Sequence, residues 1–147
     1  MQNNNNYGHP KGGYSQSMAA EDFMRNHSFD PKWVQEQADQ AMVAFAEEAG
    51  KSMAENELTT SKIRSVYGEI KRIQMGTFNQ GKSSFILLKP KMAYALGRDR
   101  NNQGLKLFKL IFDKCYDLVS DEKTFVNFCH FMEAILAYHK ANAKKNY

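Results

Sequence analysis

Apolar residues recur every three or four positions through most of residues 30–143, which is the spacing of one face of an α-helix. No segment of useful length shows the strict alternation of a half-buried strand. The pattern divides into five segments, at about residues 30–49, 58–75, 84–97, 103–119 and 120–143. The sequence therefore predicts an all-α fold, a compact bundle of about five helices.

The N-terminal residues have a different composition. Residues 1–20 are rich in Asn, Gly, Ser and Gln and have neither a helical nor a strand period. We expect a disordered tail over residues 1–28 and one helical bundle domain over residues 29–147. The first helix is expected to begin at Asp30 and Pro31, which suit a helix start, and to end at Gly50.

Several functional classes find no support in the sequence. No run of about 18 apolar residues exists, so no membrane span is expected, and the N-terminus does not resemble a signal peptide. Cys115 and Cys129 fall in apolar helical segments and are expected to be buried free thiols of a cytoplasmic protein. His130 and His139 do not share a helix face, so structural roles are expected, with no metal and no cofactor.

Charge is sorted along the chain. Residues 58–110 contain 11 of the 20 Lys and Arg residues but only two of the 16 acidic residues, Glu69 and Asp99. Residues 1–57 are net acidic, and residues 111–147 are neutral. A basic segment of this kind repels itself unless an anion lies nearby, and the phosphate backbone of a nucleic acid is the first candidate.

The expected helices present these cations in two stripes. Arg64 and Lys71 flank the apolar stripe of the second helix, with Lys62 and Glu69 on its opposite flank. Lys91 and Arg98 lie seven residues apart on the third helix, with Tyr94 between them, and Pro90 should kink that helix or mark a new start near Lys89. We expect a basic set to converge on one surface, namely Arg64, Lys71, Lys91, Arg98 and Arg100.

One string invites an enzymatic interpretation. Residues 76–83 fit the phosphate-loop pattern GxxxxGK[ST], with Lys82 as its lysine. A phosphate loop joins a strand to a helix, whereas this string is expected to be a loop between two helices. Because no paired carboxylates and no nucleophile with its base are evident either, we expect no enzymatic activity.

Three longer segments of the sequence resemble those of a known protein family. Residues 58–64 (LTTSKIR), 88–98 (LKPKMAYALGR) and 128–140 (FCHFMEAILAYHK) are similar, in this order, to the small helical subunit of type III-A CRISPR effector complexes, the second Csm protein. The resemblance covers about residues 30–142. Members of this family often end in glycines, whereas here Ala141, Asn142 and Ala143 follow the third string.

The resemblance implies a non-catalytic subunit of an antiviral defence complex. Several copies would stack head to tail along the guide-binding backbone subunits, in a complex that also contains a large subunit and a capping subunit. They would line the channel in which guide RNA pairs with target RNA and would contact the RNA backbone. The expected RNA-binding residues are Lys62, Arg64, Lys71, Arg72, Lys89, Lys91, Arg98 and Arg100.

A stand-alone helical DNA-binding regulator is the alternative. A helix-turn-helix joins its two helices through a turn of about three or four residues. The second and third expected helices are separated by about nine residues, which disfavours that motif.

Overall fold

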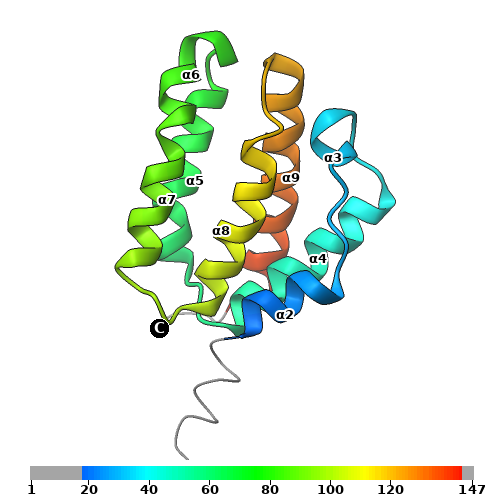
Figure 1. Cartoon of the computed structure of the whole chain (residues 1–147), viewed down its shortest axis with the longest axis vertical. Coiled ribbons are helices and arrows are strands. Elements are labelled where there is room, and N and C mark those ends of the chain that lie inside the picture. The colour runs from blue at the N-terminus through cyan, green and yellow to red at the C-terminus, as the bar shows by residue number, and fades with distance from the viewer. Residues whose placement is uncertain (1–17, 144–147) are drawn as a thin grey trace, which may run out of the picture.

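The computed structural model describes residues 18–143, and all of the regular elements in this range are helices (Figure 1). They are α2 (Ala19–Asn26), α3 (Lys32–Gln35), α4 (Gln40–Glu55), α5 (Thr60–Gln74), α6 (Phe78–Ile86), α7 (Leu88–Gly97), α8 (Gln103–Tyr116) and α9 (Glu122–Asn142). The predicted all-α class is confirmed. The predicted number of five is wrong, because the described range holds seven helices besides the four-residue turn α3.

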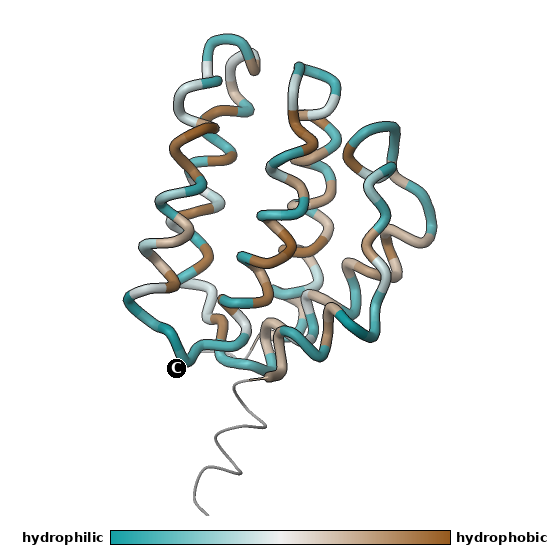
Figure 2. Tube along the Cα trace, in the orientation of Figure 1, coloured by the Kyte–Doolittle hydropathy of each residue, from teal (hydrophilic) through white to brown (hydrophobic). Residues whose placement is uncertain are grey.

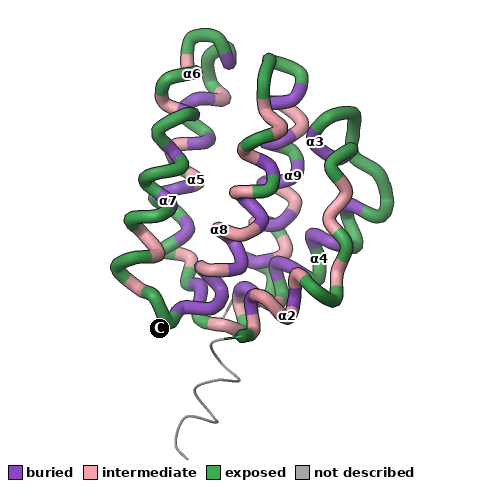
Figure 3. The backbone as a smooth tube through the Cα atoms, viewed as in Figure 1, coloured by how far each residue is buried: buried purple, intermediate pink, exposed green. Residues whose placement is uncertain are grey.

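Helix α9 contacts α3, α4, α5 and α6, and its inward face is buried from its first turn to its last (Figures 1 and 3). Helix α4 lies along α9, α2 crosses beside α8 and α4, and α7 packs against α8. Figure 2 shows apolar and polar residues alternating along each helix, so every turn contributes to both the core and the surface.

Two groups of aromatic rings hold the bundle together. One joins α2, α3 and α4 to α9 and consists of Phe23, Phe29, Trp33, Phe45 and Phe131. The other joins α6, α8 and α9 and consists of Phe78, Phe85, Phe112, Tyr116, Phe125 and Phe128. Since each large ring buries about 150–250 Å², these groups account for much of the apolar surface removed from water.

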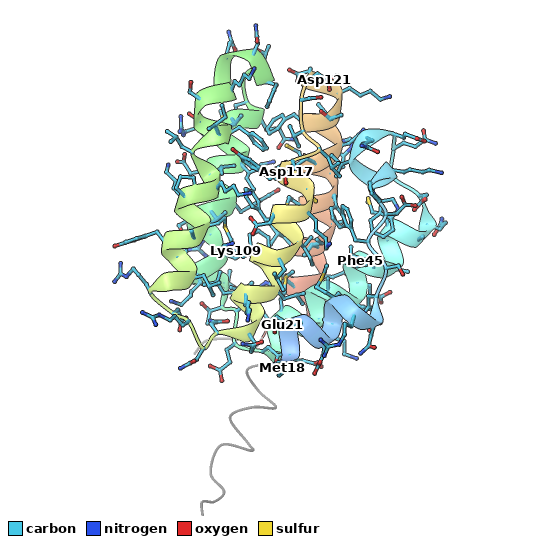
Figure 4. All side chains as sticks on the ribbon, in the orientation of Figure 1. Met18, Glu21, Phe45, Lys109, Asp117 and Asp121 are labelled. Atoms are coloured by element: carbon cyan, nitrogen blue, oxygen red, sulfur yellow. The ribbon has the colours of Figure 1, made fainter. Side chains whose placement is uncertain are left out.

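The predicted tail contains a helix. Helix α2 buries Ala20 and Phe23 against α8 and α4, and the Ala20 amide donates a hydrogen bond of 2.9 Å to Gln103 Oε1. Glu21, labelled in Figure 4, forms an ion pair with Lys106. The boundary at residue 28 is therefore wrong, because the folded domain begins by Ala19. The prediction for residues 1–17 lies outside the described residues.

The first predicted helix is two elements, and it does not end at Gly50. Asp39 interrupts it because its carboxylate caps a new helix, accepting a hydrogen bond of 2.8 Å from the Met42 amide. Helix α4 continues past Gly50 to Glu55. Gly50 is needed for close packing, since a Cβ there would lie 2.5 Å from the His139 backbone nitrogen of α9.

The predicted loop over residues 76–84 is mostly helix α6. Thr77 and Gln80 form a capping box, in which each side chain accepts a hydrogen bond from the other residue's backbone amide. The fresh start predicted near Lys89 is confirmed, because α7 begins at Leu88 after a break at Leu87. Pro90 falls in the first turn of α7, where a missing amide breaks no helical hydrogen bond.

The two cysteines are free and buried, as predicted. Burial raises the pKa of the Cys115 thiol. The pKa of Cys129 is raised to about 12, chiefly by burial and then by the Glu133 carboxylate. Neither thiol forms the reactive thiolate near neutral pH.

Candidate nucleic-acid interface

Helix α5 carries four of the predicted RNA-binding residues, and its packing decides where they point. Thr59 caps the helix by accepting a hydrogen bond of 3.2 Å from the Lys62 amide. The buried stripe consists of Ile63, Val66, Ile70 and Ile73. At 100° per residue, Lys62 and Glu69 lie on one flank of this stripe. Arg64 and Lys71 lie on the other flank, so the two pairs face different neighbours.

The first flank of α5 forms a groove with α7, here called the α5–α7 groove. Its volume is about 800 Å³. Its walls carry Lys62, Ser65 and Glu69 from α5, Pro90, Lys91 and Tyr94 from α7, and Arg98, the residue that follows α7. Its apolar floor includes the buried residues Val66, Leu88 and Leu105. Three cations therefore surround a depression with an apolar base.

Both acidic residues of the basic segment meet these cations. Lys62 Nζ lies 3.0 Å from Asp99 Oδ2, and Lys91 Nζ lies 3.3 Å from Glu69 Oε1. The same Glu69 oxygen accepts a hydrogen bond of 2.9 Å from Arg72. Arg72, and then Lys91, hold the pKa of Glu69 below its usual range. The pKa of Asp99 is lowered by its hydrogen bond from Asn102 and then by Lys62.

Tyr94 is the aromatic residue of this groove. Its side chain is well exposed, with 67% of the residue accessible. The guanidinium carbon of Arg98, the residue that follows α7, lies 5.8 Å from the centroid of the Tyr94 ring. Because that separation suits a cation–π contact, the ring and the guanidinium stand together at the rim.

The second flank of α5 forms a smaller groove with α9, here called the α5–α9 groove, of about 550 Å³. Its walls carry Arg64, Tyr67, Glu133 and Lys140, and its base includes Ile63, Leu136 and His139. Lys71 beside it lies 3.5 Å from Glu133 and 5.9 Å from the centroid of the Tyr67 ring. Burial, and then the Glu133 carboxylate, raises the pKa of Tyr67 to about 12.

His139 is a structural residue at the base of the α5–α9 groove. It is 1% exposed, and its Nε2 lies 2.6 Å from the Leu58 carbonyl oxygen. Since that oxygen can only accept, Nε2 carries the proton and donates it. The two preceding carbonyls of the same turn also accept hydrogen bonds, Glu57 from Asn102 at 2.9 Å and Asn56 from the Gly104 amide at 2.7 Å. The structural role predicted for His139 is confirmed.

The remaining predicted residues lie elsewhere. The Lys89 ammonium lies 4.9 Å from the centroid of the Tyr116 ring on α8, outside both grooves. Arg100 is exposed in the turn after α7 and forms no ion pair with any residue that the structure describes. Lys82 is exposed on α6, so the string that fits the phosphate-loop pattern continues into a helix from its third residue.

The predicted convergence is therefore wrong for part of the set. Lys91 and Arg98 share the α5–α7 groove with Lys62, which lies on the opposite flank of α5 from Arg64 and Lys71. Arg64 and Lys71 face α9 instead. The angle of α5 about its own axis was predictable from its apolar stripe, but the neighbour that each flank would meet was not.

Sequence reasoning missed the counter-ions and Lys140. Glu69 is 22 residues from Lys91, so no local spacing reveals their pairing. Lys106 and Lys109 add to the basic count of the segment, yet they pair with Glu21 and Asp113. Within residues 18–143, no group of three or more His, Cys, Asp or Glu residues is placed to hold a metal ion, and no helix is long and apolar enough to cross a membrane.

A comparison with protein families decides the relationship that the three strings suggested. The family model described as Csm2 Type III-A matches residues 36–145, about three quarters of the chain. The chain belongs to the Csm2 family. The Csm2 match reaches from the turn before α4 past the end of α9 and so includes both grooves. Neither the curated proteins nor the solved structures gave a match.

Membership of the Csm2 family makes this chain a small subunit of a type III-A CRISPR effector complex, and the resemblance found in the sequence is confirmed. Csm2 proteins are structural small subunits that work alongside the other Csm subunits.

Proposed function

We propose that this subunit lines the channel in which guide RNA pairs with target RNA and contacts the RNA backbone through the α5–α7 groove. The observation that carries the proposal is the meeting of Lys62, Lys91 and Arg98 around one depression. Such cations bind phosphates whatever the base sequence, which suits a subunit that must serve any guide. Further proposed contacts in the cytoplasmic complex are the guide-binding backbone subunits, the large subunit, the capping subunit and additional copies of this chain.

The subunit acts in this proposal by holding RNA and not by reacting with it. Lys82 and Ser83 lie within helix α6, whereas the glycine-rich loop of a nucleotide-binding site wraps phosphates with backbone amides. Target cleavage and nucleotide chemistry are therefore assigned to other subunits. ATP turnover by the purified chain that is abolished in Lys82→Ala would contradict this assignment.

The experiment compares two triple variants that remove the same charge. Lys62→Gln, Lys91→Gln and Arg98→Gln are combined in one protein. The control combines Lys32→Gln, Lys51→Gln and Lys123→Gln, which are exposed on α3, α4 and α9. Binding of a labelled single-stranded RNA is measured across a range of salt concentrations.

Loss of three phosphate contacts should reduce the magnitude of the salt slope by about 2, at about 0.7 per contact for single strands. The affinity at low salt should fall by about tenfold or more, which corresponds to at least about 1.4 kcal/mol. The control should keep the parent slope, because its cations lie away from the groove. Equal losses in the two variants would mean that RNA responds only to total charge and would contradict the proposal.

The connection between α5 and α6 removes one objection to the DNA-binding alternative. Helices α5 and α6 are joined by only three residues, 75–77, and not by the nine that the sequence predicted. The length of the connection therefore no longer argues against a helix-turn-helix. Titration with duplex DNA tests this candidate. Tight, sequence-dependent binding that survives the groove variant but is lost in Lys82→Gln on α6 would favour the regulator over the RNA subunit.

A further inference from the structure

The α5–α7 groove has a feature that phosphate binding leaves unused. Tyr94 presents its ring to solvent on the groove wall, between Lys91 on α7 and Arg98 just past the end of that helix. A single exposed aromatic residue on a helix is ordinary by itself. Here, however, the ring stands within a depression rimmed by three cations, and the Arg98 guanidinium lies beside it at 5.8 Å.

We propose that Tyr94 is a stacking platform for an unpaired RNA base, held while the surrounding cations bind the phosphates on either side of that nucleotide. This inference rests on the proposed function and names the kind of RNA the groove accepts. Aromatic rings and guanidinium planes are the surfaces on which proteins stack splayed-out bases. Every base has a π-face, so stacking does not select a sequence.

The size of the groove suits an unpaired nucleotide. Its volume of about 800 Å³ falls within the roughly 300–1,000 Å³ typical of pockets for small ligands. The bases of a continuous duplex are already stacked on each other and are closed to a tyrosine ring. The ligand is therefore a single-stranded segment, or a nucleotide turned out of a duplex.

The apolar floor of the groove also favours a nucleobase as its ligand. Val66, Leu88 and Leu105 are buried beneath the groove, and Pro90 lies one turn before Tyr94 on α7. A phosphate gains nothing from contact with apolar side chains, whereas the flat face of a nucleobase is stabilised by such contact. The groove thus combines a charged rim for the backbone with an aromatic and apolar interior for a base.

The test replaces the ring without changing charge. Tyr94→Leu removes the aromatic face, and Tyr94→Phe keeps it. Ile86→Ala on α6 is the matched control, because Ile86 is an exposed apolar residue outside the groove. Each variant of the full chain is titrated with single-stranded oligouridine and with a fully paired RNA duplex. A single-stranded RNA containing 2-aminopurine reports stacking directly through the loss of its fluorescence.

Stacking on an aromatic side chain is worth about 1–3 kcal/mol per base, so Tyr94→Leu should weaken single-strand binding by about tenfold. Tyr94→Phe and Ile86→Ala should stay within about twofold of the parent. The salt slope should be the same in all four proteins, because no phosphate-binding charge is removed. Duplex binding should not respond to Tyr94→Leu, and the quenching of 2-aminopurine should be lost in that variant alone.

Several outcomes overturn the inference, and they are distinguishable from failure of the proposed function. Unchanged single-strand affinity in Tyr94→Leu, with the parent binding RNA and the groove cations still required, would leave backbone contact and remove stacking. A fall in affinity together with a shallower salt slope would show that Tyr94 acts only by positioning Arg98. No RNA binding by the parent protein would refute the proposed function and the stacking with it.

Discussion

The two grooves beside α5 contain similar residue types but differ in how those residues are exposed. Each has cations, an acidic residue and a tyrosine in its walls. In the α5–α7 groove the tyrosine is exposed, whereas Tyr67 of the α5–α9 groove is partly buried and packs against the core. The α5–α9 groove also has the buried His139 at its base, and the ring of this residue donates a hydrogen bond to the Leu58 carbonyl before α5. One basic segment thus divides its cations between an open groove with an exposed tyrosine and a groove that packs against the core.

The excess of positive charge in residues 58–110 is smaller on the surface than the sequence suggests, because acidic residues pair with some of the cations. Glu69 and Asp99 neutralise part of the α5–α7 groove, and Glu133 on α9 does the same for Lys71. These ion pairs are exposed, so each contributes only about 0–1 kcal/mol to folding. We therefore interpret the ion pairs of Glu69 and Asp99 as limits on how strongly the cations of the α5–α7 groove would attract phosphate in the proposed function.

The largest effect expected on folding comes from the α5–α9 groove. His139→Ala should lower the free energy of unfolding by about 2–4 kcal/mol, because it leaves a cavity and an unpaired Leu58 carbonyl. Lys140→Ala, its exposed neighbour, should stay within about 0.5 kcal/mol of the parent. Urea unfolding followed by circular dichroism measures both. Parent-like stability of His139→Ala would show that this groove is not a packing seam.

A smaller effect, an increase in RNA affinity, is expected from a change in the α5–α7 groove. Glu69→Gln removes the carboxylate that engages Lys91 and Arg72, so both cations become available to phosphate. RNA affinity at low salt should rise by about threefold to tenfold, and each new phosphate contact should steepen the salt slope by about 0.7.

Glu133→Gln is the matched control for that variant, since it releases Lys71 beside the other groove. Its RNA affinity should equal that of the parent. If Glu133→Gln tightens binding as much as Glu69→Gln does, both grooves contact RNA and the distinction between them fails.

The smallest effect concerns alkaline pH. The folded pKa of Tyr67 is raised from 10.0 to about 12, by burial first and by Glu133 second. The stability tied to its protonated hydroxyl is fully present below about pH 10 and is lost as the pH rises toward 12. Between pH 9 and pH 11, Tyr67→Phe should therefore lose less stability in urea than the parent does. An equal loss in the two proteins would place Tyr67 in a more solvated setting.

Sequence reasoning recovered the elements whose signal is local. The apolar period located α5, α8 and α9 to within a few residues, because each buries one continuous stripe. Two missed helices had local signals as well. Helix α2 has acidic residues in its first turn and Arg25 in its last, and α6 has the capping box of Thr77 and Gln80.

The grooves themselves were beyond such reasoning. Lys62 meets Asp99, and Lys71 meets Glu133, only because α7 and α9 pack on opposite flanks of α5. That choice depends on how the apolar stripes of several helices fit together. The role of Gly50 is of the same kind, because the glycine closes a helix contact that lies more than 80 residues away in sequence.

Photo-crosslinking of the assembled effector complex tests directly whether RNA binds in the α5–α7 groove. Ultraviolet light joins RNA to the side chains that touch it, and trypsin, cutting after Lys91 and Arg98, releases residues 92–98 with Tyr94 inside. We expect this peptide to carry the strongest RNA adduct of the subunit and peptides from the α5–α9 groove to carry little. Adducts confined to α9 and the Arg64 region, with residues 92–98 unmodified, would contradict this expectation.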